Sequence, residues 1–184
     1  MKIDFENMSI SIGLKEKGFS VLKQDEDNME YIKDKLIIGV VMDSYSYELG
    51  AYFSLENTSD RVSLQSVLEY YGITEVRGIY QVPSLAEISL GLDYVGNAIE
   101  RVILCFGESY INTFLDIVVW YERTRKKRLE EYYFNTEMET AERYWGKKEY
   151  SKAKEIYLKY ESQLSESQLK KLRYIVNREE HSLK

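Results

Sequence analysis

A run of charged residues without an apolar anchor divides this chain. Residues 122–128, ERTRKKR, place six charged side chains and one threonine over almost two helical turns. A helix through this stretch has no face to bury, so a hydrophobic core built by the preceding residues has to end there. The run contains no Pro or Gly, which favours continued helix over a flexible linker. We therefore predict two domains, residues 1–122 and residues 123–184. The sequence leaves open whether residues 109–147 form one helix or two with a break near Asn135.

The two predicted domains differ in charge. Residues 1–122 carry 9 Lys and Arg against 20 Asp and Glu, a net charge of −11. Residues 123–184 carry 16 against 11, a net charge of +5, so the chain total of −6 conceals a strong asymmetry. An acidic surface attracts basic partners, and the two parts of the chain can also attract one another.

Four apolar segments in the acidic part are typical of β-strands. They are joined by short polar connections at residues 25–28, at Asp34 and at residues 43–46. Such connections favour an antiparallel meander, because parallel strands require long crossovers. The predicted strands cover residues 19–24, 29–33, 36–42 and 47–55.

Helix signals flank the predicted strands. We expect a first helix over residues 6–17, ended by Gly18, and a short helix capped by Ser63 that ends before Gly72. Ser84 and Glu87 form a capping-box pattern ahead of an apolar stripe that continues to residue 106 and would cover the sheet. The predicted fold class is α+β: an antiparallel β-meander of about four strands packed with helices, followed by an α-helical C-terminal hairpin extension.

The C-terminal part repeats an amphipathic helical pattern on either side of residues 146–149. Its small and aromatic residues stand at relative positions 1, 4, 10, 13 and 17; they are Ala141, Tyr144, Tyr150, Ala153 and Tyr157. This spacing resembles a tetratricopeptide repeat over residues 134–165, although Glu137 and Ser165 depart from the family's Trp and Pro. The resemblance implies that these residues pack two helices together and do not line a catalytic pocket. A final helix, with a capping-box pattern from Ser165 to Gln168, would close the hairpin.

Few residues of the sequence suit catalysis or metal binding. Residues 107–111 lack the second glycine of a nucleophile elbow, and the single histidine, His181, lies near the C-terminal end. One cysteine and one histidine do not make a structural zinc site, and no glycine-rich phosphate loop is present. We predict no cofactor, no metal site and no catalytic residue. An enzyme with a site of scattered carboxylates and tyrosines remains the alternative.

The sequence also bears on compartment and partners. Cys105 has no second cysteine for a disulfide, and its apolar surroundings, VILCFG, predict a buried thiol. The apolar runs are too short to span a membrane, and the N-terminus lacks a signal-peptide pattern, so we expect a cytoplasmic protein. The basic run at residues 123–128 has Glu122, Glu130 and Glu131 within one or two helical turns, which argues against nucleic acid as a partner. Both a monomer and a homodimer fit the sequence.

These features favour a non-catalytic protein-interaction module. The size, net charge, aromatic content and strand-then-helix order resemble those of small acidic bacterial immunity proteins. The resemblance implies binding and blocking a toxin, often a basic nuclease, through the acidic half. An adaptor that binds a peptide through the helical hairpin is the alternative of the same class.

The predicted binding site is the connection between the third and fourth strands. Hairpin connections present side chains to solvent, and tyrosines beside carboxylates are frequent at interfaces. Lysine at positions 43 and 48 would then slow partner capture at low ionic strength and leave thermal unfolding nearly unchanged. The candidate binding residues are Asp43, Tyr45, Tyr47, Glu48 and the nearby Glu56.

Overall fold

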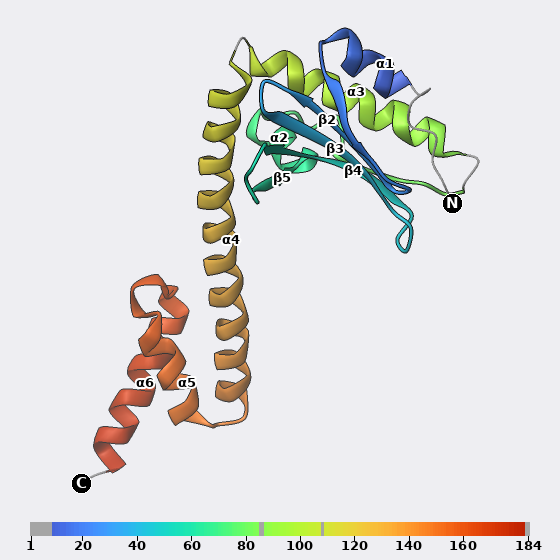
Figure 1. Cartoon of the computed structure of the whole chain (residues 1–184). Coiled ribbons are helices and arrows are strands. Elements are labelled where there is room, and N and C mark those ends of the chain that lie inside the picture. The colour runs from blue at the N-terminus through green and yellow to red at the C-terminus, as the bar shows by residue number, and fades with distance from the viewer. Residues whose placement is uncertain (1–8, 85–86, 108, 183–184) are drawn as a thin grey trace. The chain divides into compact units, whose positions relative to one another are not determined.

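A computed structural model of the chain describes residues 9–84, 87–107 and 109–182 (Figure 1). The chain divides into two compact units, unit 1 (Met1–Arg123) and unit 2 (Thr124–Lys184). The buried side chains of each unit form a hydrophobic cluster of their own.

Unit 1 is built on a six-stranded antiparallel sheet. The order β1-β2-β3-β4-β5 follows the sequence, and β6 pairs with the remaining length of β4. The predicted antiparallel meander and α+β class are thus confirmed. The strands are β1 (Ser20–Gln24), β2 (Asn28–Lys33), β3 (Leu36–Asp43), β4 (Glu48–Leu55), β5 (Arg61–Ser63) and β6 (Ile79–Gln81).

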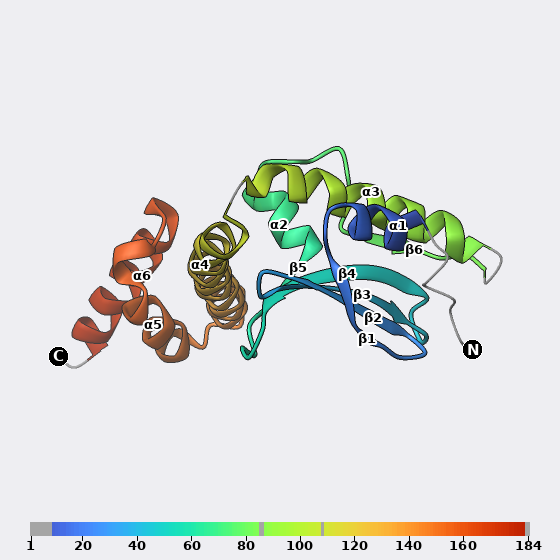
Figure 2. The same cartoon turned by 45° about the horizontal axis from the view of Figure 1, so that its top comes forward.

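Buried and partly exposed side chains alternate along the central strand β3, as expected for a sheet that is covered by helices on one face only. Leu36, Ile38, Val40 and Met42 of β3 are buried, whereas Ile37 and Val41 are only partly covered. The buried side faces α1 (Ser9–Glu16), α2 (Leu64–Tyr70) and α3 (Ile88–Phe106), which all lie on the same side of the sheet (Figure 2). The stripe of α3 that includes Leu92, Val95, Ile99 and Val102 is fully buried, so it covers the sheet as predicted.

As predicted, Gly18 ends α1 and Ser63 caps the start of α2. Gly18 adopts φ +85° after α1, where its amide donates to Lys15 O and the amide of Phe19 donates to Leu14 O. These two bonds form a Schellman motif, for which glycine is the favoured residue. At α2, Ser63 Oγ accepts a bond from the amide of Ser66 at 3.2 Å.

The helix start predicted at Ser84 is wrong. The first residue of α3 is Ile88, and Glu87 occupies its N-cap position without a side-chain capping bond. The amide of Glu87 donates to Ser84 O at 3.0 Å, an i to i−3 bond, and Glu87 has 3-10 conformation directly before α3. Leu85 and Ala86, which the prediction placed in the helix, lie outside the described residues.

Cys105 is exposed, contrary to the expectation of a buried thiol. The apolar stretch around it belongs to α3, in which Val102, Ile103 and Phe106 face the core. Helical periodicity turns the residues between them outward, so Leu104 is 75% exposed. An apolar run therefore does not bury each of its members.

The helix α4 (Tyr110–Gly146) is continuous through Asn135, which settles the alternative that the sequence left open. Its first turns, with Phe114 and Ile117, complete the core of unit 1. Its last turns pack in unit 2 with α5 (Tyr150–Lys159) and α6 (Glu166–Ser182). The exposed 3-10 turn η2 (Glu161–Gln163) lies between these two helices in the chain.

The capping box predicted ahead of α6 is confirmed. The amide of Ser165 donates to Gln168 Oε1 at 2.8 Å, and the amide of Gln168 donates to Ser165 Oγ at 3.4 Å. Each side chain therefore satisfies a backbone donor of the other residue at the helix start.

Candidate functional site

The loop between β3 and β4 is closed by the side chain of Asp43. Asp43 ends β3 and pairs with Glu48, the first residue of β4. Its Oδ1 accepts bonds from the amides of Tyr45 at 2.8 Å and Ser46 at 3.2 Å. These amides, Tyr45 foremost, lower the pKa of Asp43, because they bond to its ionised form. Asp43 is thus a turn-forming residue, whose carboxylate is engaged with the backbone.

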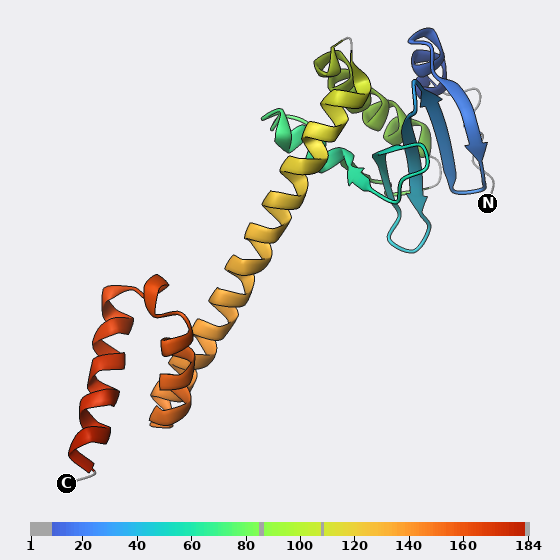
Figure 3. The same ribbon diagram turned by 60° about the vertical axis from the view of Figure 1, so that its left-hand side comes forward.

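A second strand supports the same loop from the side. Gln81 Nε2, at the end of β6, donates to Ser46 O at 2.5 Å, and the amide of Val82 donates to Tyr47 O at 2.8 Å. Tyr47 has φ +55°, a left-handed conformation that is uncommon for residues other than glycine. The loop backbone is therefore held at several points, although it projects from the end of the sheet (Figure 3).

Two tyrosines point outward from this fixed backbone. Tyr45 is 97% exposed and Tyr47 is 49% exposed, while Glu48 is partly covered. A highly exposed aromatic side chain on a loop whose backbone is hydrogen-bonded at several points suits an interface anchor. The backbone of such a loop loses little conformational freedom when a partner binds.

Glu56 does not belong to this group. It follows the last residue of β4, so the eight residues of that strand, roughly 27 Å at 3.4 Å per residue, separate it from the loop. Its amide donates to Lys35 O at 2.8 Å, which places it beside the β2–β3 turn at the opposite end of the sheet. The structure brings Asp43, Tyr45, Tyr47 and Glu48 together and leaves Glu56 apart from them.

Gln81 is the member of the site that sequence reasoning missed. The three residues of β6 are too few to show a strand periodicity, and 23 residues separate β6 from the end of β4, the strand with which it pairs. No local pattern links Gln81 to the loop that it supports.

Polar side chains on the other face of the sheet make a structural cluster. The ring of Tyr52 lies across Gly39, where a Cβ atom would stand 2.2 Å from its Cζ, and its hydroxyl donates to Glu30. Burial, with a smaller contribution from Glu30, raises the pKa of Tyr52 to about 12, so its phenol stays protonated near neutral pH. Arg61 stacks 4.3 Å from the Tyr52 ring centroid and lies 3.7 Å from Glu30. Each group has a partner within the protein, and the cluster joins β2, β4 and β5.

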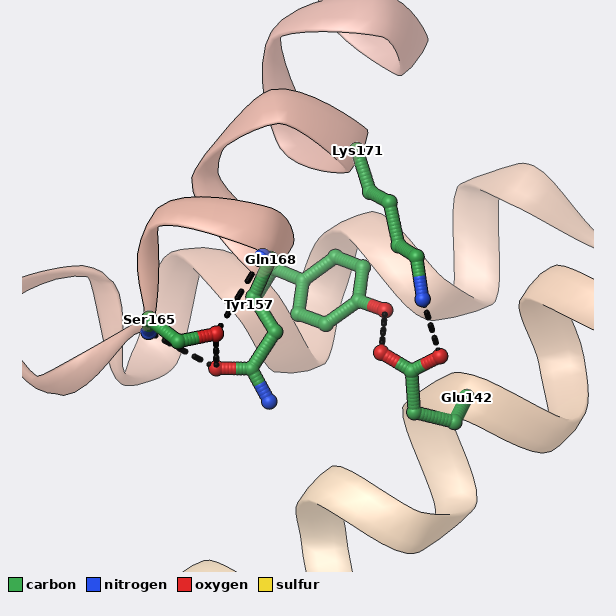
Figure 4. A network of polar contacts seen from close by, with 5 residues as sticks. All are labelled: Glu142, Tyr157, Ser165, Gln168 and Lys171. Atoms are coloured by element: carbon green, nitrogen blue, oxygen red, sulfur yellow. Dashed lines mark hydrogen bonds and ion pairs between the residues drawn. The ribbon is translucent and has the colours of Figure 1, made fainter.

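A comparable network ties the helices of unit 2 together (Figure 4). Glu142 of α4 accepts a bond from the hydroxyl of Tyr157 of α5 at 2.9 Å and forms an ion pair with Lys171 of α6. Burial, followed by the effect of Glu142, raises the pKa of Tyr157 above its ordinary value. Because the Tyr157 ring is fully buried, this contact belongs to helix packing.

The small residues of the same hairpin are also packing residues. Ala141 and Ala153 are both fully buried in the core of unit 2. The contacts of Tyr144 and Tyr150 with that core are partial. The packing role expected for these residues agrees with their burial, and the resemblance to a tetratricopeptide repeat itself stays a prediction.

The described residues contain no group of three or more His, Cys, Asp or Glu side chains that could hold a metal ion. His181 is exposed, and its Nδ1 lies 2.6 Å from Asn177 O, one turn earlier in α6. Over the same part of the chain, no single helix has the length and apolar content to cross a membrane, whereas α3 and α4 meet that criterion only as a pair bent by 104°.

No family model, no curated protein and no solved structure matches this chain.

Proposed function

We propose that unit 1 binds a basic protein partner through the β3–β4 loop and acts as a non-catalytic inhibitor, in the manner of an immunity protein. The observation that carries this proposal is the 97% exposure of Tyr45 on a loop whose backbone Asp43 and Gln81 fix. An exposed tyrosine supplies apolar area and a hydroxyl at a small entropic cost, so it serves as an anchor.

The charge of the same region supports a basic partner. Residues 1–122 carry a net charge of −11, and Glu48 stands beside the two tyrosines. Complementary charge accelerates encounter with a basic surface more than it strengthens the bound state. Tyr45 would therefore determine the lifetime of the complex and the acidic residues its rate of formation.

The experiment replaces Tyr45 with the photo-crosslinking residue benzoylphenylalanine in cells of the source organism. The matched control carries the same residue at Leu104, which is 75% exposed on α3 of unit 1. We expect a basic protein to crosslink at position 45 and not at position 104.

Binding of that purified protein is then measured with Tyr45→Ala and Tyr45→Phe. Alanine should weaken binding by about 30-fold, the loss typical of an interface hot spot, and phenylalanine should retain most of it. An alanine variant that binds as tightly as the natural chain would refute the assignment. So would an acidic crosslinked protein, or one captured equally at both positions.

A further inference from the structure

Unit 2 contains a groove that the proposed function does not use. It lies between the middle of α4 and the end of α5 with η2, and its volume is about 560 Å³. Pockets that bind ligands span roughly 300–1,000 Å³, so the groove has room for more than one side chain.

Aromatic rings line the groove. Phe134 of α4 and Tyr160, which follows α5, meet edge to face with ring centroids 5.3 Å apart, and both are partly buried against the core of unit 2. Tyr133 lines the groove as well and is 58% exposed. These rings offer π-faces, which attract cations in addition to apolar groups.

One wall of the groove already holds a cation. Lys159 Nζ bonds Glu137 Oε1 at 2.5 Å and stands 5.0 Å from the ring centroid of Tyr160. The chain's own lysine thus lies between a carboxylate and an aromatic ring. A cationic group from another molecule would find a carboxylate and an aromatic ring together again at residues 130–134 of α4, before Glu137 in the chain.

These carboxylates are Glu130 and Glu131, which precede Glu137 in α4 and also line the groove. Their own partners, Lys126 and Lys127, stand at 4.0 Å and 3.8 Å, and all four side chains are at least 60% exposed. Exposed i,i+4 pairs of this length contribute little, a few tenths of a kcal/mol. An incoming cation can therefore engage these carboxylates without breaking a strong contact.

We propose that this groove binds an arginine side chain on an extended segment of a partner protein. The planar guanidinium can bond a carboxylate in bidentate fashion and stack on a ring at the same time, which an ammonium group cannot do. Glu130 and Tyr133 are three residues apart on α4 and both line the groove, so they share a face of the helix. Three glutamates against two lysines also leave the lining with a net negative charge.

The test uses the complete chain and two synthetic peptides. The first is acetyl-Gly-Arg-Leu-Arg-Gly-amide, and in the second both arginines are replaced by citrulline, which has nearly the same shape and no charge. Binding is followed by the chemical shifts of the α4 and α5 amides at low ionic strength. We expect the arginine peptide to shift residues around Tyr133 and Tyr160, and the citrulline peptide to bind at least about tenfold more weakly.

Paired variants distinguish the groove from general acidity. Glu130→Gln with Glu131→Gln should weaken binding of the arginine peptide by about fivefold or more, and Tyr133→Ala should also weaken it. The matched control, Glu139→Gln with Glu155→Gln, removes the same charge from exposed positions outside the groove and should change binding less than about twofold.

Equal binding of the two peptides, equal losses in the two paired variants, or no binding of the arginine peptide would overturn the proposal. None of these outcomes bears on the proposed binding role of the β3–β4 loop, because the groove and the loop belong to different units.

Discussion

At the scale of single residues, Asp43 links the pH of the solution to the order of the β3–β4 loop. The ordinary pKa of an aspartate is about 3.9, and bonds from the amides of Tyr45 and Ser46 lower that of Asp43 in the folded protein. A lowered pKa means that the stabilisation is complete above the unfolded value and is lost as the pH falls through the folded value. We expect the amide shifts of Tyr45 and Ser46 to titrate with a midpoint below about 3.9.

Two substitutions at Asp43 check this assignment by NMR. Asp43→Asn keeps an oxygen acceptor, so the loop should stay closed while the titration disappears. Asp43→Ala removes the acceptor, so both amides should exchange faster with solvent. An alanine variant with unchanged titration and exchange would contradict the turn-forming role.

The bonds from the loop amides to Asp43 make position 43 unsuitable for a test of charge alone. Lysine at position 43 would remove a charge and the turn together, so slower partner capture could not be attributed to charge alone. Glu48 has no such bond among the described contacts of the loop, and Glu48→Gln isolates its charge. The sequence places carboxylates beside tyrosines in this connection, but it does not reveal that the Asp43 carboxylate accepts hydrogen bonds from the amides of its own loop.

At the scale of elements, the Glu142 network makes α4, α5 and α6 depend on one another. Glu142→Ala would leave the hydroxyl of the buried Tyr157 without its acceptor, so we expect the free energy of unfolding to fall by about 1–3 kcal/mol. In a Tyr157→Phe background the same substitution should cost less, because no hydroxyl is left unpaired. Urea denaturation of the four chains of this double-mutant cycle measures the difference.

Glu139→Ala is the control, since Glu139 is exposed on the same helix and should change stability by less than about 0.5 kcal/mol. Additive effects at Glu142 and Tyr157 would show that their hydrogen bond contributes nothing to the folded state.

The elements that could be predicted are those set by neighbouring residues. The strands of the meander are joined by short turns, and Gly18, Ser63 and Ser165 act within five residues of themselves. The strand that was missed, β6, depends on a distant partner. It pairs with the edge of β4. The start of α3 is a local case, because a 3-10 bond from the amide of Glu87 to Ser84 O, and not the predicted capping box, precedes Ile88. The groove of unit 2 joins segments that are some 30 residues apart, which no local pattern reports.

At the scale of the whole molecule, the two hydrophobic clusters have no member in common. Phe114, Ile117 and the partly buried Tyr121 are the last apolar residues that pack in unit 1, and Phe134 is the first in unit 2. A fragment of residues 1–123 therefore retains each apolar residue of the first cluster. We expect it to unfold cooperatively, with a Tm within about 5 °C of the corresponding transition in the complete chain.

The fragment of residues 1–123 is more acidic than the whole chain, so it also tests whether the acidic unit captures a basic partner. Residues 1–123 carry 10 Lys and Arg against 20 Asp and Glu, a net −10 compared with −6 for the chain. If the β3–β4 loop captures a basic partner, the fragment should bind it with an affinity within about threefold of the complete chain, because the anchor is unchanged. Its association rate should be equal or higher at low ionic strength, where long-range attraction is least screened, and the difference should vanish near 1 M salt. A folded fragment that associates more slowly than the complete chain at low salt would show that the basic unit 2, and not the acidic unit 1, meets the partner first.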